Sequence, residues 1–114
     1  MRLEIKAARI VDPASKRDSP GSIFIADGKI AALDRAPDGF RADETIDAKG
    51  LVACPGLVDL SARLREPGFE YKATLESEMR AAVTGGVTTL ACPPDTDPPL
   101  DEPGLVEMLT RRAA

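Results

Sequence analysis

The second half of the chain switches repeatedly between a strand pattern and a helix pattern, and this alternation constrains its fold most. A short, mostly apolar run at 57–60 is typical of a buried parallel strand, and a β-branched run at 87–91 predicts a second one. Thr74 is a helix-capping residue, and Gly85-Gly86 would end the helix between the two strands. Strand, helix, strand, helix with short connections is the order of a parallel sheet or barrel.

Apolar residues recur at helical spacing in both predicted helices. The first helix carries four apolar residues on one face: Leu75, Met79, Ala82 and Val83. The second follows a proline-rich segment at 92–103, would be capped by Asp101, and carries Leu105, Val106 and Leu109. A closed barrel of this class needs eight such units and roughly 250 residues. The sequence therefore predicts the first two βα units of a TIM-type barrel over residues 55–114, with the barrel incomplete.

Residues 1–54 carry a different pattern, which predicts a domain of β-strands. Five strands are expected, at or around 2–7, 22–26, 29–33, 45–46 and 51–54. Asp12-Pro13 is a turn signal that would close the first strand. Asp27-Gly28 is a residue pair favoured in a tight type I′ hairpin turn. The fold class is therefore mixed β and α/β, with its domain boundary between residues 54 and 55.

Composition and charge exclude several classes of partner. Hydrophobic residues make up 43% of the chain and charged residues 30%, the mix of a soluble globular protein. The net charge of −4, with no basic run, disfavours nucleic acid as a partner. No apolar stretch approaches the ~20 residues that cross a bilayer, and the alternating first residues are unlike a signal peptide. We therefore expect a cytoplasmic protein that binds neither nucleic acid nor membrane.

The two cysteines, Cys54 and Cys92, are isolated, and each lies beside a proline at a predicted strand end. They could form a disulfide, a pair of ligands or two plain core thiols. Two cysteines in a chain of otherwise cytosolic character favour plain thiols.

The segment from Asp59 to Gly68, Asp-Leu-Ser-Ala-Arg-Leu-Arg-Glu-Pro-Gly, is the most informative about chemistry. It resembles the first metal-binding strand of the dihydroorotase family, a branch of the amidohydrolases. In that family the segment reads Asp-x-His-x-His-x-Arg-x-Pro-Gly, and its two histidines hold catalytic zinc. Ser61 and Arg63 stand at those positions here, and the chain contains no histidine. A serine is a weak neutral ligand and an arginine has no free lone pair, so these are vestigial metal positions.

The geometry of a strand predicts how these positions would act together. Alternate residues share a face, so Ser61, Arg63 and Arg65 are expected to point into the mouth of the barrel. At about 4 Å and an effective dielectric of about 20, an arginine would repel a metal by ~4 kcal/mol per unit of metal charge. The alternative for Arg63 is a surface arginine, or one paired with Asp59 or Glu66, and it also excludes a metal. We therefore expect no zinc and no other cofactor.

A second pair of positions corresponds to the substrate site of the family. The resemblance implies that Arg65 would clamp a substrate carboxylate, a bidentate task suited to its planar guanidinium. The family's partner is an asparagine in a Pro-Asn-Thr segment, and the matching segment here is Pro94-Asp95-Thr96. Asp95 would repel that carboxylate and is expected to pair with Arg65. In an inactive homologue, Arg63 and Asp95 would be internal salt-bridge partners together with Arg65. Arg65 and Asp95 are therefore vestigial substrate-carboxylate positions, and no catalytic residue is expected in this chain.

The resemblance extends over most of the chain. The segment 25–30 is similar to part of the small β-sandwich domain that flanks amidohydrolase barrels, so 1–54 is expected to be the N-terminal part of that domain. The family's later residues, a bridging lysine, two further histidines and the catalytic aspartate, would lie beyond Ala114. The chain is therefore expected to be the N-terminal portion of a larger protein, natural or truncated.

An incomplete barrel also leaves apolar surface without cover. Four apolar residues on the inner faces of the two strands are affected: Leu57, Val58, Val87 and Leu90. Because uncovered strand edges and apolar patches recruit other chains, we expect the 114-residue chain to self-associate.

The retained scaffold motifs and the altered site residues leave three hypotheses about function. The first is a catalytically inactive dihydroorotase homologue of pyrimidine biosynthesis, a structural partner of the aspartate transcarbamoylase catalytic subunit, as in some bacteria. The second is an active dihydroorotase or related cyclic amidohydrolase that dispenses with the usual ligands or holds one ion through downstream residues. The third is a fragment with no activity of its own. Loss concentrated at the site favours the first.

Overall fold

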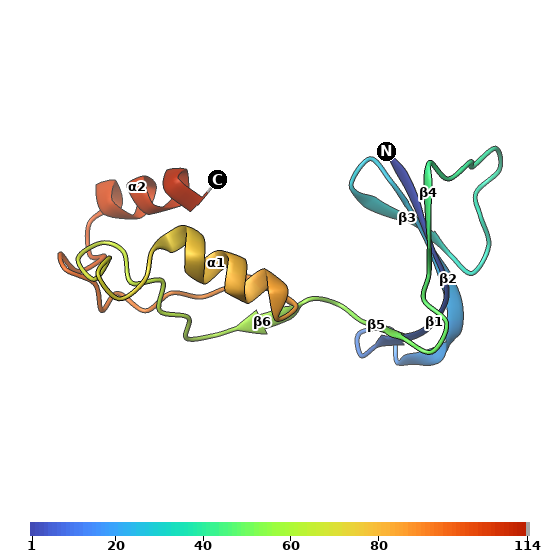
Figure 1. Cartoon of the computed structure of the whole chain (residues 1–114), viewed down its shortest axis with the longest axis horizontal. Helices are drawn as coiled ribbons and strands as arrows, with labels where there is room; N and C mark the ends of the chain where they lie inside the picture. Colours follow the sequence, from blue (N-terminus) through green and yellow to red (C-terminus); the bar gives the residue numbers. More distant parts are fainter. Residues whose placement is uncertain (114) are drawn as a thin grey trace. The chain divides into compact units, whose positions relative to one another are not determined.

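The computed structural model describes residues 1–113, and the chain divides into two units, Met1–Pro55 and Gly56–Ala114 (Figure 1). Each unit contains its own sheet. Among the described residues, no helix is both long and apolar enough to span a membrane.

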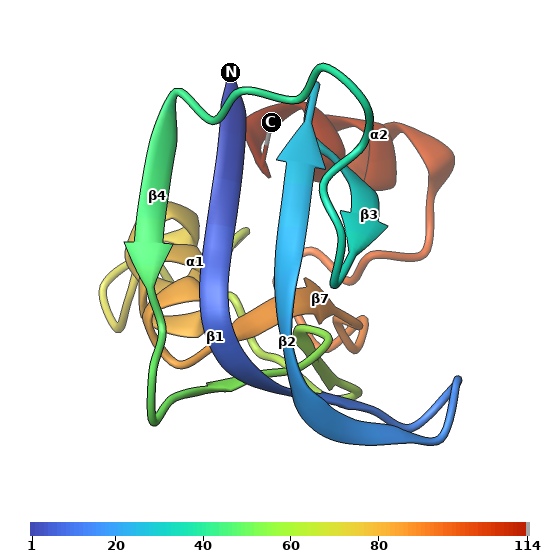
Figure 2. The same cartoon turned by 90° about the vertical axis from the view of Figure 1, so that its right-hand side faces the viewer.

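The first unit is built on one five-stranded sheet (Figure 2). Its strands are β1 (Arg2–Asp12), β2 (Arg17–Ala26), β3 (Lys29–Leu33), β4 (Glu44–Asp47) and β5 (Val52–Ala53). The order is β3-β2-β1-β4, and β5 also pairs with β1. β1, β2 and β3 are antiparallel neighbours, whereas β4 and β5 run parallel to β1. All five expected strands are present, but residues 1–55 supply one sheet and therefore one layer of the expected sandwich.

Local turn chemistry explains the hairpin between β2 and β3. Asp27 and Gly28 have φ angles of 52° and 72°, the positive values that a type I′ turn requires, so this prediction is confirmed. β2 is longer than its apolar pattern predicts, because it begins at Arg17 and pairs with the second half of β1. Strand pairing, rather than apolar alternation, therefore sets its length.

Small and β-branched residues form the core of the first unit. The buried cluster consists of Ala8, Ile10, Ile23 and Ala48, with Ile5, Ile25 and Ala53 packed against it. Phe24 contributes a separate contact, because its ring meets the Phe40 ring edge-on with centroids 5.3 Å apart. This contact holds the connection between β3 and β4 against the sheet.

The second unit has the expected strand, helix, strand, helix order. Its elements are β6 (Leu57–Asp59), α1 (Leu75–Thr84), β7 (Val87–Leu90) and α2 (Pro103–Ala113). β6 and β7 are parallel and begin in register, with Leu57 opposite Val87. Within residues 56–113 the sheet has two strands, as expected for the first two βα units of an incomplete barrel.

The two helices begin differently. Thr74 caps α1 as predicted: its hydroxyl accepts the Ser77 N–H, and the Ser77 hydroxyl accepts the Thr74 N–H in return. The predicted cap of α2 by Asp101 is wrong. Helix α2 starts at Pro103, and the Glu102 carbonyl accepts the first helical N–H groups, because proline is well suited to the first helical position.

Burial on α1 is uneven. Leu75, at its first position, is 3% exposed, and Met79 and Ala82 are half-buried. Val83, predicted on the same face, is 69% exposed because no element of residues 56–113 covers it. The second unit therefore has a thin core in this chain.

We expect the 114-residue chain to self-associate through the second unit. Leu57, Val58 and Leu60 are 56%, 58% and 80% exposed, and β6 and β7 each have one strand neighbour among residues 56–113. Such apolar strand edges pair with other chains. Light scattering should show species larger than a monomer, or hydrogen exchange should show weak protection beyond residue 55. A monodisperse monomer with all strands protected would contradict this prediction.

Candidate functional site

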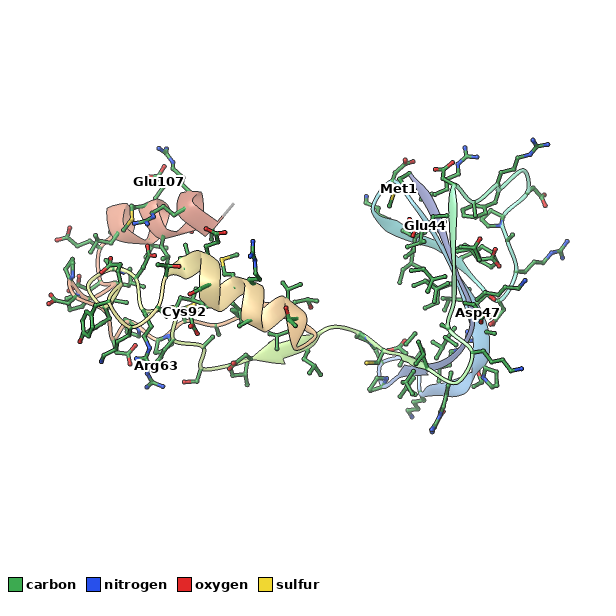
Figure 3. All side chains as sticks on the ribbon, in the orientation of Figure 1. Met1, Glu44, Asp47, Arg63, Cys92 and Glu107 are labelled. Atoms are coloured by element: carbon green, nitrogen blue, oxygen red, sulfur yellow. The ribbon has the colours of Figure 1, made fainter. Side chains whose placement is uncertain are left out.

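Two loops that follow the parallel strands form the candidate site. We name residues 60–73, between β6 and α1, the site loop, and residues 91–102, between β7 and α2, the proline loop. Figure 3 shows Arg63 in the site loop and Cys92 in the proline loop. The loops start side by side, because the Ala62 N–H donates to the Ala91 carbonyl at 3.0 Å.

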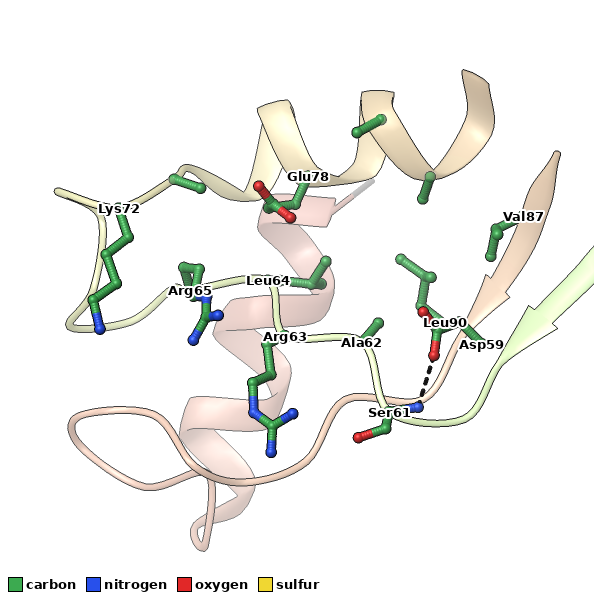
Figure 4. Close-up of a pocket in the computed structure, with 13 residues that line it drawn as sticks. Asp59, Ser61, Ala62, Arg63, Leu64, Arg65, Lys72, Glu78, Val87 and Leu90 are labelled. Carbon is green, nitrogen blue, oxygen red and sulfur yellow. Dashed lines mark hydrogen bonds between the residues drawn. The ribbon is translucent and has the colours of Figure 1, made fainter. Parts of the chain in front are cut away.

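The expected strand alternation of Ser61, Arg63 and Arg65 is wrong. Strand β6 ends at Asp59, whose Oδ1 accepts the Ser61 N–H at 2.9 Å in a tight turn. Arg65 has a φ of +67°, far from the values of about −120° to −140° of regular strand backbone. All three side chains nevertheless line one pocket (Figure 4). The loop, rather than a strand face, brings them together.

The pocket carries charges of both signs. Arg63, Arg65 and Lys72 extend from the site loop, whereas Glu78 comes from α1 and Asp59 from the end of β6 (Figure 4). Its apolar wall consists of Leu64, Val87, Leu90 and alanines of the site loop and α1. Such a pocket can bind polar molecules through the cations, but its acidic groups limit its preference for anions.

An ion pair joins the two loops. Arg63 Nε donates to Asp95 Oδ2 at 2.5 Å, and both side chains are 48% exposed. The hydrogen bond from Arg63 lowers the pKa of Asp95, and the positive charges of Arg63 and Arg65 add to this effect. The Arg63 guanidinium, at the second expected metal position, is therefore paired with a carboxylate of this chain.

The partners of these charges differ in part from those that the sequence predicts. The expected salt bridge between Arg63 and Asp95 is confirmed. The expected pairing of Asp95 with Arg65 is wrong, because its hydrogen-bond donor is Arg63. Arg63 pairs with neither Asp59 nor Glu66. Asp59 accepts a backbone N–H, and Glu66 forms an ion pair with Arg112 at 2.6 Å. Loop geometry decides among carboxylates that the sequence leaves equivalent.

Two further residues of the site loop are not among the site residues that the sequence predicts. Lys72 lines the pocket, and its ammonium lies 5.0 Å from the centroid of the Phe69 ring and 5.5 Å from that of Tyr71. Glu66 is buried beneath the loop. The sequence signal for Lys72 is the adjacent Phe-Glu-Tyr-Lys run, which places a cation beside two aromatic rings.

Neither cysteine takes part in a disulfide. Cys54 and Cys92 are both free and both exposed, so the disulfide alternative is not found and their placement in a core is wrong. Partial burial raises the pKa of the Cys92 thiol, and the negative charge of Asp59 raises it further. Both effects disfavour the thiolate, which is the form that binds metals and acts as a nucleophile.

The Asp95 pair should make the second unit less stable in acid. The pKa of Asp95 is lower in the folded state than in the unfolded state. The pair therefore stabilises the fold fully at pH values above the unfolded-state pKa of Asp95, and this stabilisation is lost as the pH falls through its folded-state pKa. In Asp95→Asn, urea unfolding should therefore depend less on pH below about pH 4 than in the wild type. Asp101→Asn, in the same loop, is the control. Equal pH dependence of the wild type and Asp95→Asn would contradict the prediction.

Comparison with known proteins identifies the family. Residues 50–114, more than half of the chain, match the family model described as dihydro-orotase-like. The chain belongs to the dihydroorotase-like family. A dihydroorotase-like protein of Pseudomonas aeruginosa is 53% identical over 113 residues, covering 99% of this chain and 27% of the relative. A dihydroorotase of Syntrophus aciditrophicus is 40% identical over 114 residues, covering 99% of this chain and 27% of the relative. The chain thus spans about a quarter of the length of these curated relatives.

Solved structures agree with a place in the amidohydrolase superfamily. L-hydantoinase from Arthrobacter aurescens superimposes with a TM-score of 0.80 at 28% identity, covering 97% of this chain and 24% of that chain. A D-hydantoinase superimposes with a TM-score of 0.72 at 30% identity, covering 99% of this chain and 24% of that chain. The dihydroorotase-like chain therefore has part of the amidohydrolase fold, as its motifs predicted.

The residues at the first two metal positions of the dihydroorotase-like family do not fit zinc. Ser61 offers only a neutral hydroxyl, and Arg63 has N–H donors without a lone pair and is bound to Asp95. Within residues 1–113, no group of three or more histidine, cysteine or acidic side chains is placed to hold a metal ion. No metal-dependent step is assigned to these residues.

Proposed function

We propose that the whole protein is a catalytically inactive dihydroorotase homologue of pyrimidine biosynthesis in the cytoplasm. In this proposal it serves as a structural partner of the catalytic subunit of aspartate transcarbamoylase. One observation carries the proposal: Arg63, at a vestigial metal position, forms an ion pair with Asp95, at a vestigial substrate position. One ion pair thus joins a residue of the expected metal site to a residue of the expected substrate site.

The ion pair supports inactivity in two ways. A metal ion would have to displace Asp95 from Arg63 and then remain beside a permanent positive charge, which repels it. A substrate carboxylate would meet the negative charge of Asp95, where the family has a neutral amide. Both functions are therefore opposed by charge.

Retention of the scaffold supports a structural role. The second unit keeps the parallel β6–β7 pair, the capping box of α1 and the helix end at Gly85, although the metal positions have changed. Such features maintain shape without taking part in chemistry. A stable protein–protein interface of roughly 1,200–2,000 Å² depends on preserved shape, which a barrel provides.

An active dihydroorotase or related cyclic amidohydrolase is the second candidate. It is favoured by the 40% identity to a protein named dihydroorotase and by Arg65, which keeps its motif position and lines the pocket. In that case the metal would be held by residues outside this chain.

Zinc content and turnover separate the two candidates. The whole protein, purified and supplied with zinc, should retain no more metal than background after mild chelation, because Ser61 and Arg63 do not bind it. It should also fail to hydrolyse dihydroorotate under conditions in which an active dihydroorotase turns it over. Stoichiometric zinc together with turnover would establish the second candidate instead.

A further inference from the structure

Glu66 is the one buried charged residue among residues 1–113, with 4% of its surface exposed. A buried carboxylate is costly unless hydrogen bonds or opposite charges compensate it. Glu66 lies in the site loop between Arg65, which lines the pocket, and Pro67, whose carbonyl accepts the Asp97 N–H at 3.1 Å. The buried Glu66 carboxylate is therefore part of the loop that forms the candidate site.

The two carboxylate oxygens of Glu66 contact two different helices. Oε1 accepts the N–H of Leu75, the first residue of α1, at 2.8 Å, where the positive end of the helix dipole also favours a negative charge. Oε2 lies 2.6 Å from a guanidinium nitrogen of Arg112, in the last turn of α2. This second contact is an ion pair without hydrogen-bond alignment, so Arg112 compensates charge rather than completing a directed bond.

We propose that Glu66 is the positioning residue of the site loop, fixing it to α1 and α2 with Arg112 as its counter-ion. One carboxylate joins the site loop to the start of the adjoining helix α1 and to the last turn of the distant helix α2. Arg65 and Pro67, its neighbours, are thereby fixed to the pocket and to the proline loop. The inference holds for a catalytic or a non-catalytic protein, because it concerns the backbone of the site loop.

Residue-resolved amide hydrogen exchange of the whole protein tests this role. Glu66→Ala should lower the protection of the Leu75 and Asp97 amides by about tenfold or more, because both depend on the anchored loop. The Ala62 amide, which donates to Ala91 at the start of the loop, should change by less than about twofold. Glu66→Gln keeps an acceptor for the Leu75 N–H and should restore most of the Leu75 protection.

Removal of the counter-ion gives an independent test. Arg112→Ala leaves the buried carboxylate uncompensated, so it should lower Leu75 protection more than the double variant Glu66→Gln/Arg112→Ala does. Arg111→Ala and Glu76→Gln remove matched charges from exposed pairs on α2 and α1 and should leave Leu75 protection unchanged. If Glu66→Ala does not fold, the comparison of Arg112→Ala with the double variant tests the proposal by itself, and equal Leu75 protection in the two would contradict it.

Two results would overturn the proposal. One is unchanged protection of Leu75 and Asp97 in Glu66→Ala. The other is an equal fall at Ala62, Leu75 and Asp97, which would mean that Glu66 supports the stability of the whole unit without positioning the loop.

Discussion

Gly68→Ala is expected to destabilise the second unit by about 2–4 kcal/mol, enough to unfold much of it. Gly68 has a φ of +97°, which an L-residue with a side chain rarely adopts. A Cβ atom there would also collide with the carbonyl oxygen of Asp97 and lie 2.7 Å from the Asp97 Cβ. The site loop and the proline loop would have to separate, and the Asp97 N–H would lose its bond to the Pro67 carbonyl.

Gly104→Ala is the matched control for this substitution. Gly104 lies in the first turn of α2, and apart from its chain neighbours and the backbone of its own helix, no atom lies within 4 Å of the place that an alanine Cβ would take. Alanine there should have a neutral to slightly stabilising effect. Urea unfolding followed by the far-ultraviolet helical signal reports on the second unit, since both helices of residues 1–113 belong to it. A Gly68→Ala midpoint equal to that of the wild type would contradict the close approach of the two loops.

Features set by adjacent residues could be predicted from the sequence. The Asp27-Gly28 turn and the capping of α1 by Thr74 are confirmed, because each depends on the chemistry of a few neighbouring residues. The order of strands and helices after residue 55 is confirmed for the same reason. The motif alone indicates the vestigial positions Ser61 and Arg63, and this assignment stays a prediction, although both residues line one pocket.

Features set by distant contacts could not be predicted. Alternation predicts a strand that continues to Arg65, but a bond from the Ser61 N–H to the Asp59 side chain ends it early. Arg63 and Asp95 are 32 residues apart, and the sequence predicts both Arg63 and Arg65 as partners of Asp95. Only the folded loops show that Arg63 donates to that carboxylate and Arg65 does not. The exposure of Val83 also depends on surroundings that a helical pattern does not describe.

Aspartate transcarbamoylase in the native host is expected to depend on the whole protein for its assembly. The proposal assigns the protein a role based on shape, so the contacts with its partner would use its surface and not the Arg63–Asp95 pair. Arg63→Gln should therefore break the ion pair and still support assembly. If Arg63→Gln abolished assembly while leaving the fold intact, the site itself would have a function that a scaffold does not need.

Reconstitution of aspartate transcarbamoylase from its purified catalytic subunit, with and without the whole protein, tests the proposed role most directly. Complex size by light scattering and transcarbamoylase activity should both be measured. The scaffold proposal predicts a large complex and full activity only when the protein is present, without dihydroorotate turnover. A catalytic subunit that assembles and works fully by itself would contradict it.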